Sequence, residues 1–180
     1  MKAWLLPIAL WALTASAEES VTVCFNYGCQ RQETVRLADA QLESLRQLLA
    51  SASDAEEERK AIALAVGRLY GWAAEQTPIG ADRGGNLADE GHEGRMDCID
   101  HSTTADRLLR MIERHGWLRF HRVLDRVLRR RFLVMEHWSA VVEDRVGGRF
   151  VVDSWFGGAL KPPLVMPLEE WLAGGGEIVE

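Results

Sequence analysis

The chain has 180 residues, of which 47% are hydrophobic and 27% are charged, and its formal net charge at pH 7 is -6. This length and composition predict one domain with enough apolar surface to bury a core. Because the net charge is negative, the sequence disfavours nucleic acid and anionic lipid as partners.

The first 17 residues have the features of a secretory signal. Lys2 is followed by an apolar run from Ala3 to Leu13, and small residues then lead to Ala17. This pattern predicts cleavage after Ala17. A retained anchor is the less favoured alternative, because the run is shorter than the roughly 20 residues that cross a bilayer. We therefore expect residues 18–180 to form a single periplasmic or secreted domain with no stable membrane span.

Three cysteines are present, and an oxidising compartment favours the pairing of two of them. Cys24 and Cys29 lie in CFNYGC, where Gly28 helps the chain to bend, so they are the expected disulfide. Cys98 then remains as a free thiol. The four residues between Cys24 and Cys29 differ from the two-residue gap of thioredoxin-like motifs, which disfavours a redox function.

Apolar residues at helical spacing predict two helices after this pair. The first runs from Leu37 to Leu49, with a possible cap at Asp39. A capping box formed by Ser53 and Glu56 begins the second, which runs to about Glu75.

A third helix is expected after a long loop. Residues 77–95 contain five glycines, which predicts a loop that closes over a substrate. Asp97 can cap the helix that follows, and this helix stops near Gly116. Cys98 then lies in the first turn, where unpaired N–H groups and the helix dipole lower the pKa of a thiol and can point at a developing oxyanion. The carboxylates of Asp97 and Asp100 act in the opposite direction.

The pattern then changes from helical to extended. Strands are predicted over residues 117–124, 131–142 and 149–156. The arginines between Arg126 and Arg131 are expected on a solvated strand connection or a strand edge. A helical turn from Leu168 to Leu172 packs Trp171. Helices come first and antiparallel strands come last, so the predicted fold class is α+β.

Two polar residues lie within these apolar strands. His137 occurs in FLVMEHWSAVV, and Asp153 occurs in RFVVDSWF. A lone carboxylate in such a place is costly unless it has a partner. A hairpin loop with an odd number of residues, such as residues 143–147, places the two side chains opposite each other on one face. Asp153 then orients the imidazole, which takes the proton of Cys98 in acyl transfer through a thioester.

The order of a cysteine in RMDCIDHSTTADRLL, a histidine in EHWSAVV and an aspartate in RFVVDSWF resembles the transglutaminase-like cysteine protease superfamily. The resemblance covers roughly Met96 to Phe156. It implies a papain-like α+β core, with the nucleophile helix packed on an antiparallel sheet and catalytic roles for Cys98, His137 and Asp153. The activity implied is that of a hydrolase or acyltransferase acting on a peptide or amide bond of a peptide or protein substrate. Gln76 is a candidate oxyanion donor, against the alternative of an ordinary helix-end residue.

No cofactor is implied by this chemistry. His101 lies close to Asp97 and Asp100, but the second ligand group that zinc requires is not evident, so no metal site is predicted. His101 is expected to face solvent or the loop, and the alternative is that it supplies positive charge near the thiol. The competing function is a non-catalytic periplasmic binding domain of the same fold, in which Cys98 is simply a buried thiol.

Overall fold

The structure is a computed structural model that describes residues 19–86, 88–131 and 135–176. The expected signal segment, Met1–Ala17, lies outside these residues. In chain order the elements are β1 (Glu19–Phe25), β2 (Arg31–Leu37), α1 (Asp39–Ala50), α2 (Ala55–Gln76), a 3-10 helix η1 (Pro78–Ala81), α3 (Cys98–Arg114), β3 (His121–Arg131), β4 (Met135–Asp144), β5 (Arg149–Asp153), β6 (Leu164–Pro167) and α4 (Leu168–Leu172).

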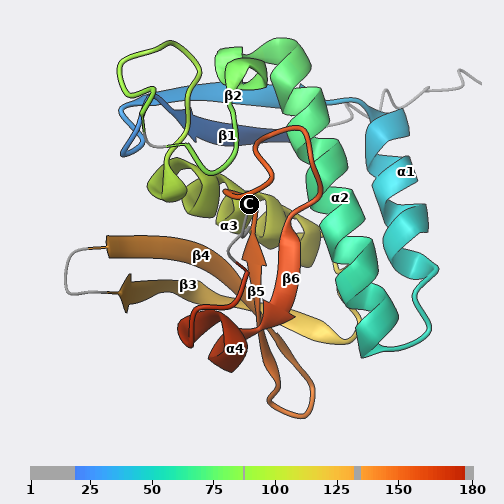
Figure 1. The fold of residues 1–180 in the computed structure, drawn as a ribbon. Helices are drawn as coiled ribbons and strands as arrows, with labels where there is room; N and C mark the ends of the chain where they lie inside the picture. The colour runs from blue at the N-terminus through green and yellow to red at the C-terminus, as the bar shows by residue number, and fades with distance from the viewer. Residues whose placement is uncertain (1–18, 87, 132–134, 177–180) are drawn as a thin grey trace, which may run out of the picture.

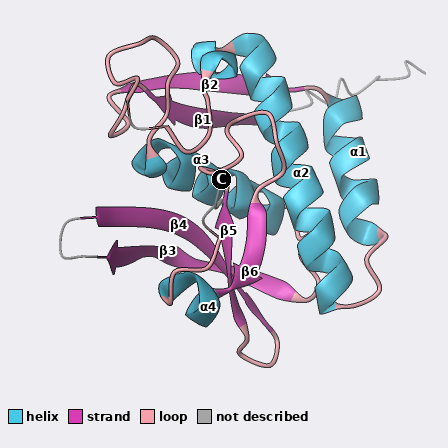
Figure 2. Cartoon of the chain, viewed as in Figure 1, coloured by secondary structure: helices cyan, strands magenta, loops and turns pink. Residues whose placement is uncertain are grey.

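Two antiparallel sheets and the helices make up a mixed α+β fold. β1 and β2 form one sheet, and the other has the strand order β3-β4-β5-β6. Helix α3 lies between the two sheets, contacting β1 on one side and β4 on the other (Figure 1). Helices α1 and α2 lie beside this stack, and α2 reaches both β2 and β6 (Figure 2). No helix in the described ranges is long and apolar enough to cross a membrane.

The four-stranded sheet has a different neighbour on each face. Val142 and Val152 belong to the large core that α2 and α3 share. Val141 and Val151 point to the other face, where they form a smaller cluster with Trp171 of α4. Because side chains alternate along a strand, odd-numbered residues of β4 and β5 face α4 and even-numbered residues face α3.

The hairpin of β1 and β2 was not predicted, and it corrects the expectation that helices come first. Val21, Val23 and Phe25 alternate along β1 and are buried in the core. The predicted disulfide between Cys24 and Cys29 is confirmed, and its two Cα atoms are 4.7 Å apart. It closes the turn that connects the two strands.

The helix starts differ from the predictions by about one residue. Helix α1 has Ala38 as its N-cap instead of the predicted Asp39. Helix α2 is capped by Asp54, whose carboxylate accepts from the backbone N–H of Glu57 at 2.9 Å. Glu57 in turn accepts from the backbone N–H of Ser53 at 2.8 Å. The cap and its partner are therefore Asp54 and Glu57, each one residue after the predicted Ser53 and Glu56.

The Arg-rich segment is part of β3, which is the edge strand of its sheet and is paired with β4. Of the two predicted positions, the connection between strands is wrong, because residues 126–131 lie within β3, and the strand edge agrees with the structure. Arg129 is nevertheless buried, because it faces the α4 side of the sheet and donates to the carbonyl of Trp171.

Candidate functional site

Cys98 is the first residue of α3, as predicted. The Asp97 carboxylate accepts from the backbone N–H groups of Ile99 at 3.0 Å and Asp100 at 2.9 Å. The Asp100 carboxylate accepts from the N–H of Asp97 at 3.1 Å. This reciprocal capping box fixes the start of the helix, so it fixes the backbone that carries the thiol.

The thiol lies against the main chain of β4. Its Sγ is 3.8 Å from the carbonyl oxygen of Glu136, and it also receives a hydrogen bond from the backbone of Trp138. Strand β5 pairs with β4 only from Ala140 onward. The segment of β4 around His137 is therefore not paired with β5, and the start of α3 lies beside it instead.

His137 and Asp153 form the pair that the sequence predicted. The imidazole Nε2 lies 2.7 Å from Asp153 Oδ2, and the two residues are 8% and 2% exposed. Because a carboxylate only accepts, Nε2 carries the hydrogen of this bond and Nδ1 takes no part in it. Cys98 contacts the residue on each side of His137 in the chain, which brings all three residues of the predicted triad into one region.

The register of this pair differs in detail from the prediction. The last pair of the hairpin is Glu143 with Arg149, so five residues, 144–148, form the loop. The odd number puts His137 and Asp153 on one face, as expected, but diagonally and not directly opposite. The loop is one residue further along the chain because the Asp144 carboxylate closes it, accepting from the backbone N–H of Gly148 at 2.7 Å.

Asp153 is held by two further donors. The indole Nε1–H of Trp171 donates to Oδ2 at 2.8 Å, and the backbone N–H of Trp155 donates to Oδ1 at 3.1 Å. Trp171 is fully buried, and the guanidinium of Arg129 lies 4.4 Å from the centre of its ring. The sequence predicted Trp171 only as a packing residue, and no local pattern connects it to Asp153.

Aromatic rings surround the imidazole. The ring centres of Trp155, Phe156 and Trp171 lie 4.9, 5.2 and 5.5 Å from that of His137. They exclude water from the bond between His137 and Asp153, and a low dielectric strengthens such a bond.

The pKa of Cys98 is raised above its ordinary value, which contradicts the expectation that the helix start lowers it. Burial is the largest cause, and the charges of Asp97 and Asp153 act in the same direction. Hydrogen bonds from the backbone of Trp138 and from the N–H of Cys98 itself lower the pKa, but they do not overcome the burial. A thiolate here needs positive charge nearby.

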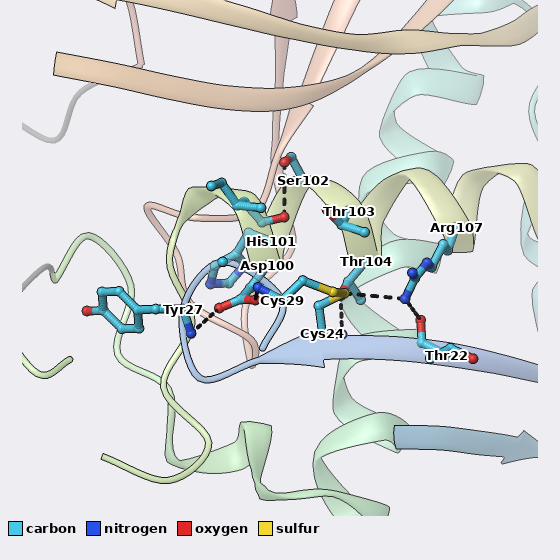
Figure 3. Close-up of a disulfide and its surroundings, with 12 residues drawn as sticks. Thr22, Cys24, Tyr27, Cys29, Asp100, His101, Ser102, Thr103, Thr104 and Arg107 are labelled. Carbon is cyan, nitrogen blue, oxygen red and sulfur yellow. Dashed lines mark hydrogen bonds between the residues drawn. A yellow bond between two sulfur atoms is a disulfide. The ribbon is translucent and has the colours of Figure 1, made fainter. Parts of the chain in front are cut away.

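The disulfide turn holds the two carboxylates that flank Cys98 in the sequence. Asn26, Tyr27, Gly28 and Cys29 all have left-handed backbone, with φ between 58° and 65°. The N–H groups of Tyr27 and Cys29 donate to Asp100 at 2.8 and 2.6 Å (Figure 3).

The N–H of Gly28 donates to Asp97 at 3.0 Å. Despite its donors, Asp100 has a pKa raised to about 6, first because it is buried and then because Asp97 is close. The cysteine pair therefore has a structural role at the start of α3, which sequence reasoning missed.

Gln76 does not serve as the oxyanion donor that was considered. Its Oε1 accepts from the N–H of Arg36 at 3.0 Å, and its Nε2 donates to the carbonyl of the same residue at 3.0 Å. Both ends of the amide are therefore bound to the edge of β2.

The Gly-rich loop is packed against the body of the protein. The N–H of Gly85 donates to the carbonyl of Trp155 at 2.9 Å. A Cβ on Gly84 would meet the backbone nitrogen of Gly158 at 2.2 Å, so the two backbones touch. The N–H of Asn26 donates to the carbonyl of Arg95 at 2.7 Å. These contacts hold both ends of the loop against the body of the protein, and its closure over a substrate stays a prediction.

Comparisons with protein-family models, curated proteins and solved structures found no match. The function of the chain is therefore inferred from the geometry of the residues described above. Within the described ranges, no group of three or more His, Cys, Asp or Glu side chains could hold a metal ion.

Proposed function

We propose that the chain is an exported cysteine hydrolase or acyltransferase that acts on a peptide or amide bond, with a papain-like core of the transglutaminase-like type. One observation carries the proposal. The hydrogen bond between His137 and Asp153 is buried, and the Cys98 thiol lies against the main chain on both sides of that histidine. The Cys24–Cys29 disulfide supports an oxidising location such as the periplasm.

The raised pKa of Cys98 specifies how the thiol is activated. The resting thiol is neutral, so His137 acts as a general base through Nδ1 when the thiol attacks a carbonyl carbon. Asp153 stabilises the imidazolium that forms, and the imidazolium then protonates the leaving amine. A thioester on Cys98 remains, and water or an acceptor amine resolves it.

The backbone N–H of Cys98 is the oxyanion donor that this geometry favours. The N–H groups of Ile99 and Asp100, which follow it in the first turn, already donate to the Asp97 carboxylate. The N–H of Cys98 lowers the pKa of its own thiol, so it is the donor next to the atom that attacks. A donor fixed by a helix start needs no reorganisation as the charge develops.

The alternative is a non-catalytic binding domain, and one observation favours it. A thiol whose pKa burial raises is typical of an inert cysteine. The two functions differ in whether the reactivity of Cys98 depends on His137.

The test is the pH dependence of iodoacetamide labelling at Cys98, followed by mass spectrometry in the wild type and in His137→Ala. Because the resting thiol is neutral, the proposal expects His137 to act as general base in labelling near neutral pH, so that labelling slows clearly in His137→Ala. His92→Ala is the matched control, because His92 is exposed in the Gly-rich loop. Labelling that follows an ordinary thiol and ignores His137 would favour the binding domain.

Acyl transfer is measured with p-nitrophenyl acetate. The wild type is expected to release p-nitrophenol in a burst and to carry an acetyl group on Cys98. Loss of the general base in His137→Ala is expected to slow acylation by roughly 100-fold or more. A wild type that is never acylated at Cys98 would contradict the proposal.

A further inference from the structure

A second buried histidine lies one helical turn after Cys98. His101 is 1% exposed, and its Nε2 lies 3.0 Å from Asp82 Oδ2 in the Gly-rich loop. Its Nδ1 lies 3.1 Å from the hydroxyl of Ser154. The predicted position facing solvent is therefore wrong, and the predicted contact with the loop is confirmed.

Ser154 extends these contacts to α2. Its Oγ lies 3.1 Å from the hydroxyl of Tyr70, which is itself 2.9 Å from the carbonyl oxygen of His101. Tyr70 and Ser154 are 0% and 2% exposed. Four buried polar groups therefore connect the loop, α3, the end of β5 and α2.

Counting hydrogens decides the charge of this network. Three contacts need a hydrogen between His101 Nδ1 and the His101 carbonyl: His101 to Ser154, Ser154 to Tyr70, and Tyr70 to the carbonyl. The two hydroxyl groups supply two hydrogens. A neutral imidazole whose only N–H is on Nε2, facing Asp82, adds no hydrogen to these contacts, so one of the three has none. An imidazolium also carries a hydrogen on Nδ1, which supplies the third.

The partner of His101 suits that charge. A proton shared by an imidazole and a carboxylate resides on the imidazole, which is the more basic group. The second oxygen of Asp82 accepts from the backbone N–H of Met96 at 2.9 Å, so both oxygens of the buried carboxylate have donors. A buried ion pair of this kind is tolerated only when its remaining hydrogen-bonding groups are satisfied.

We propose that His101 is an imidazolium paired with Asp82, and that it is a positioning residue which holds the start of α3 against the Gly-rich loop and the end of β5. The inference does not depend on the proposed function. The other charged groups near His101 on α3 are Asp97 and Asp100, and both carboxylates accept hydrogen bonds from the backbone of the disulfide turn.

The network also aligns the two halves of the site. Asp153 faces α4 and binds His137, whereas the next residue, Ser154, faces α3 and contacts His101. One strand end therefore orients the general base on one face of the sheet and contacts the nucleophile helix on the other.

The charge is tested directly by nuclear magnetic resonance on protein labelled with ¹⁵N-histidine at neutral pH. Both ring nitrogens of His101 are expected to carry hydrogens, and Asp82→Asn is expected to leave one. His101→Gln assigns the resonances by their loss. A wild-type ring with a single hydrogen would overturn the inference, whatever the fate of the proposed function.

Discussion

Trp171→Phe is the most informative single change, because it removes one hydrogen-bond donor and keeps an aromatic ring in place. The indole N–H donates to the same Asp153 oxygen that contacts His137, and Trp171 and Asp153 are 0% and 2% exposed. A hydrogen bond to a charged group contributes about 1.5–3 kcal/mol, and its buried acceptor has no water to replace the donor. We expect the free energy of unfolding to fall by at least this amount, since the smaller ring also loses contacts.

The measurement is urea unfolding of the wild type and the variant. The two free energies of unfolding are compared on the condition that both depend on urea concentration with the same slope. The corresponding fall in melting temperature is roughly 3–12 °C for a chain of this length. Trp138→Phe is the control, because Trp138 is only half-buried and its ring lies beside Arg126 at 5.4 Å. A loss in Trp171→Phe no larger than in Trp138→Phe would refute the idea that the indole N–H holds Asp153.

The remaining predictions concern the start of α3 and the edge of β2. Replacing Cys24 and Cys29 by Ala should lower the free energy of unfolding by roughly 2 kcal/mol and slow the labelling of Cys98. Thermal unfolding measures the first effect and iodoacetamide labelling the second, each in the oxidised wild type and the variant. Gln76→Ala should leave the labelling rate of Cys98 unchanged, because its amide binds Arg36. The pKa of Asp100 is raised to about 6 in the folded protein, so its contribution to stability is complete below its unfolded pKa and is lost as pH rises through about 6. Unfolding of the wild type and of Asp100→Asn, measured across that pH range, should show the wild type losing stability relative to the variant.

The parts of the site that the sequence predicted depend on local rules. Asp97 directly precedes Cys98, so its role as the N-cap and the place of Cys98 in the first turn follow from helix geometry. His137 and Asp153 share a face because the hairpin loop has an odd number of residues, and this parity is independent of where the loop begins. The one-residue error in the loop changed their offset but not their face.

The parts that were missed depend on contacts between distant segments. Trp171 reaches Asp153 only because α4 folds back against one face of the four-stranded sheet, and no spacing in the sequence encodes that contact. The left-handed turn after Cys24 was not visible either, because Asn26 and Tyr27 adopt positive φ without being glycine. The alternation of Val21, Val23 and Phe25 did carry the signal for β1.

The carboxylates around Cys98 bear on the choice between an enzyme and a binding domain. Asp97 and Asp100 receive backbone N–H donors from the disulfide turn, whereas Asp153 receives Trp171 and His137. Burying acidic groups at one place costs stability unless each is bound by donors, and here the donors come from the disulfide turn, β4 and α4. A thiol that only fills space needs none of them. The arrangement is explained if its use is to fix Cys98 beside a general base, and for that reason the dependence of Cys98 reactivity on His137 is the comparison that separates the two functions.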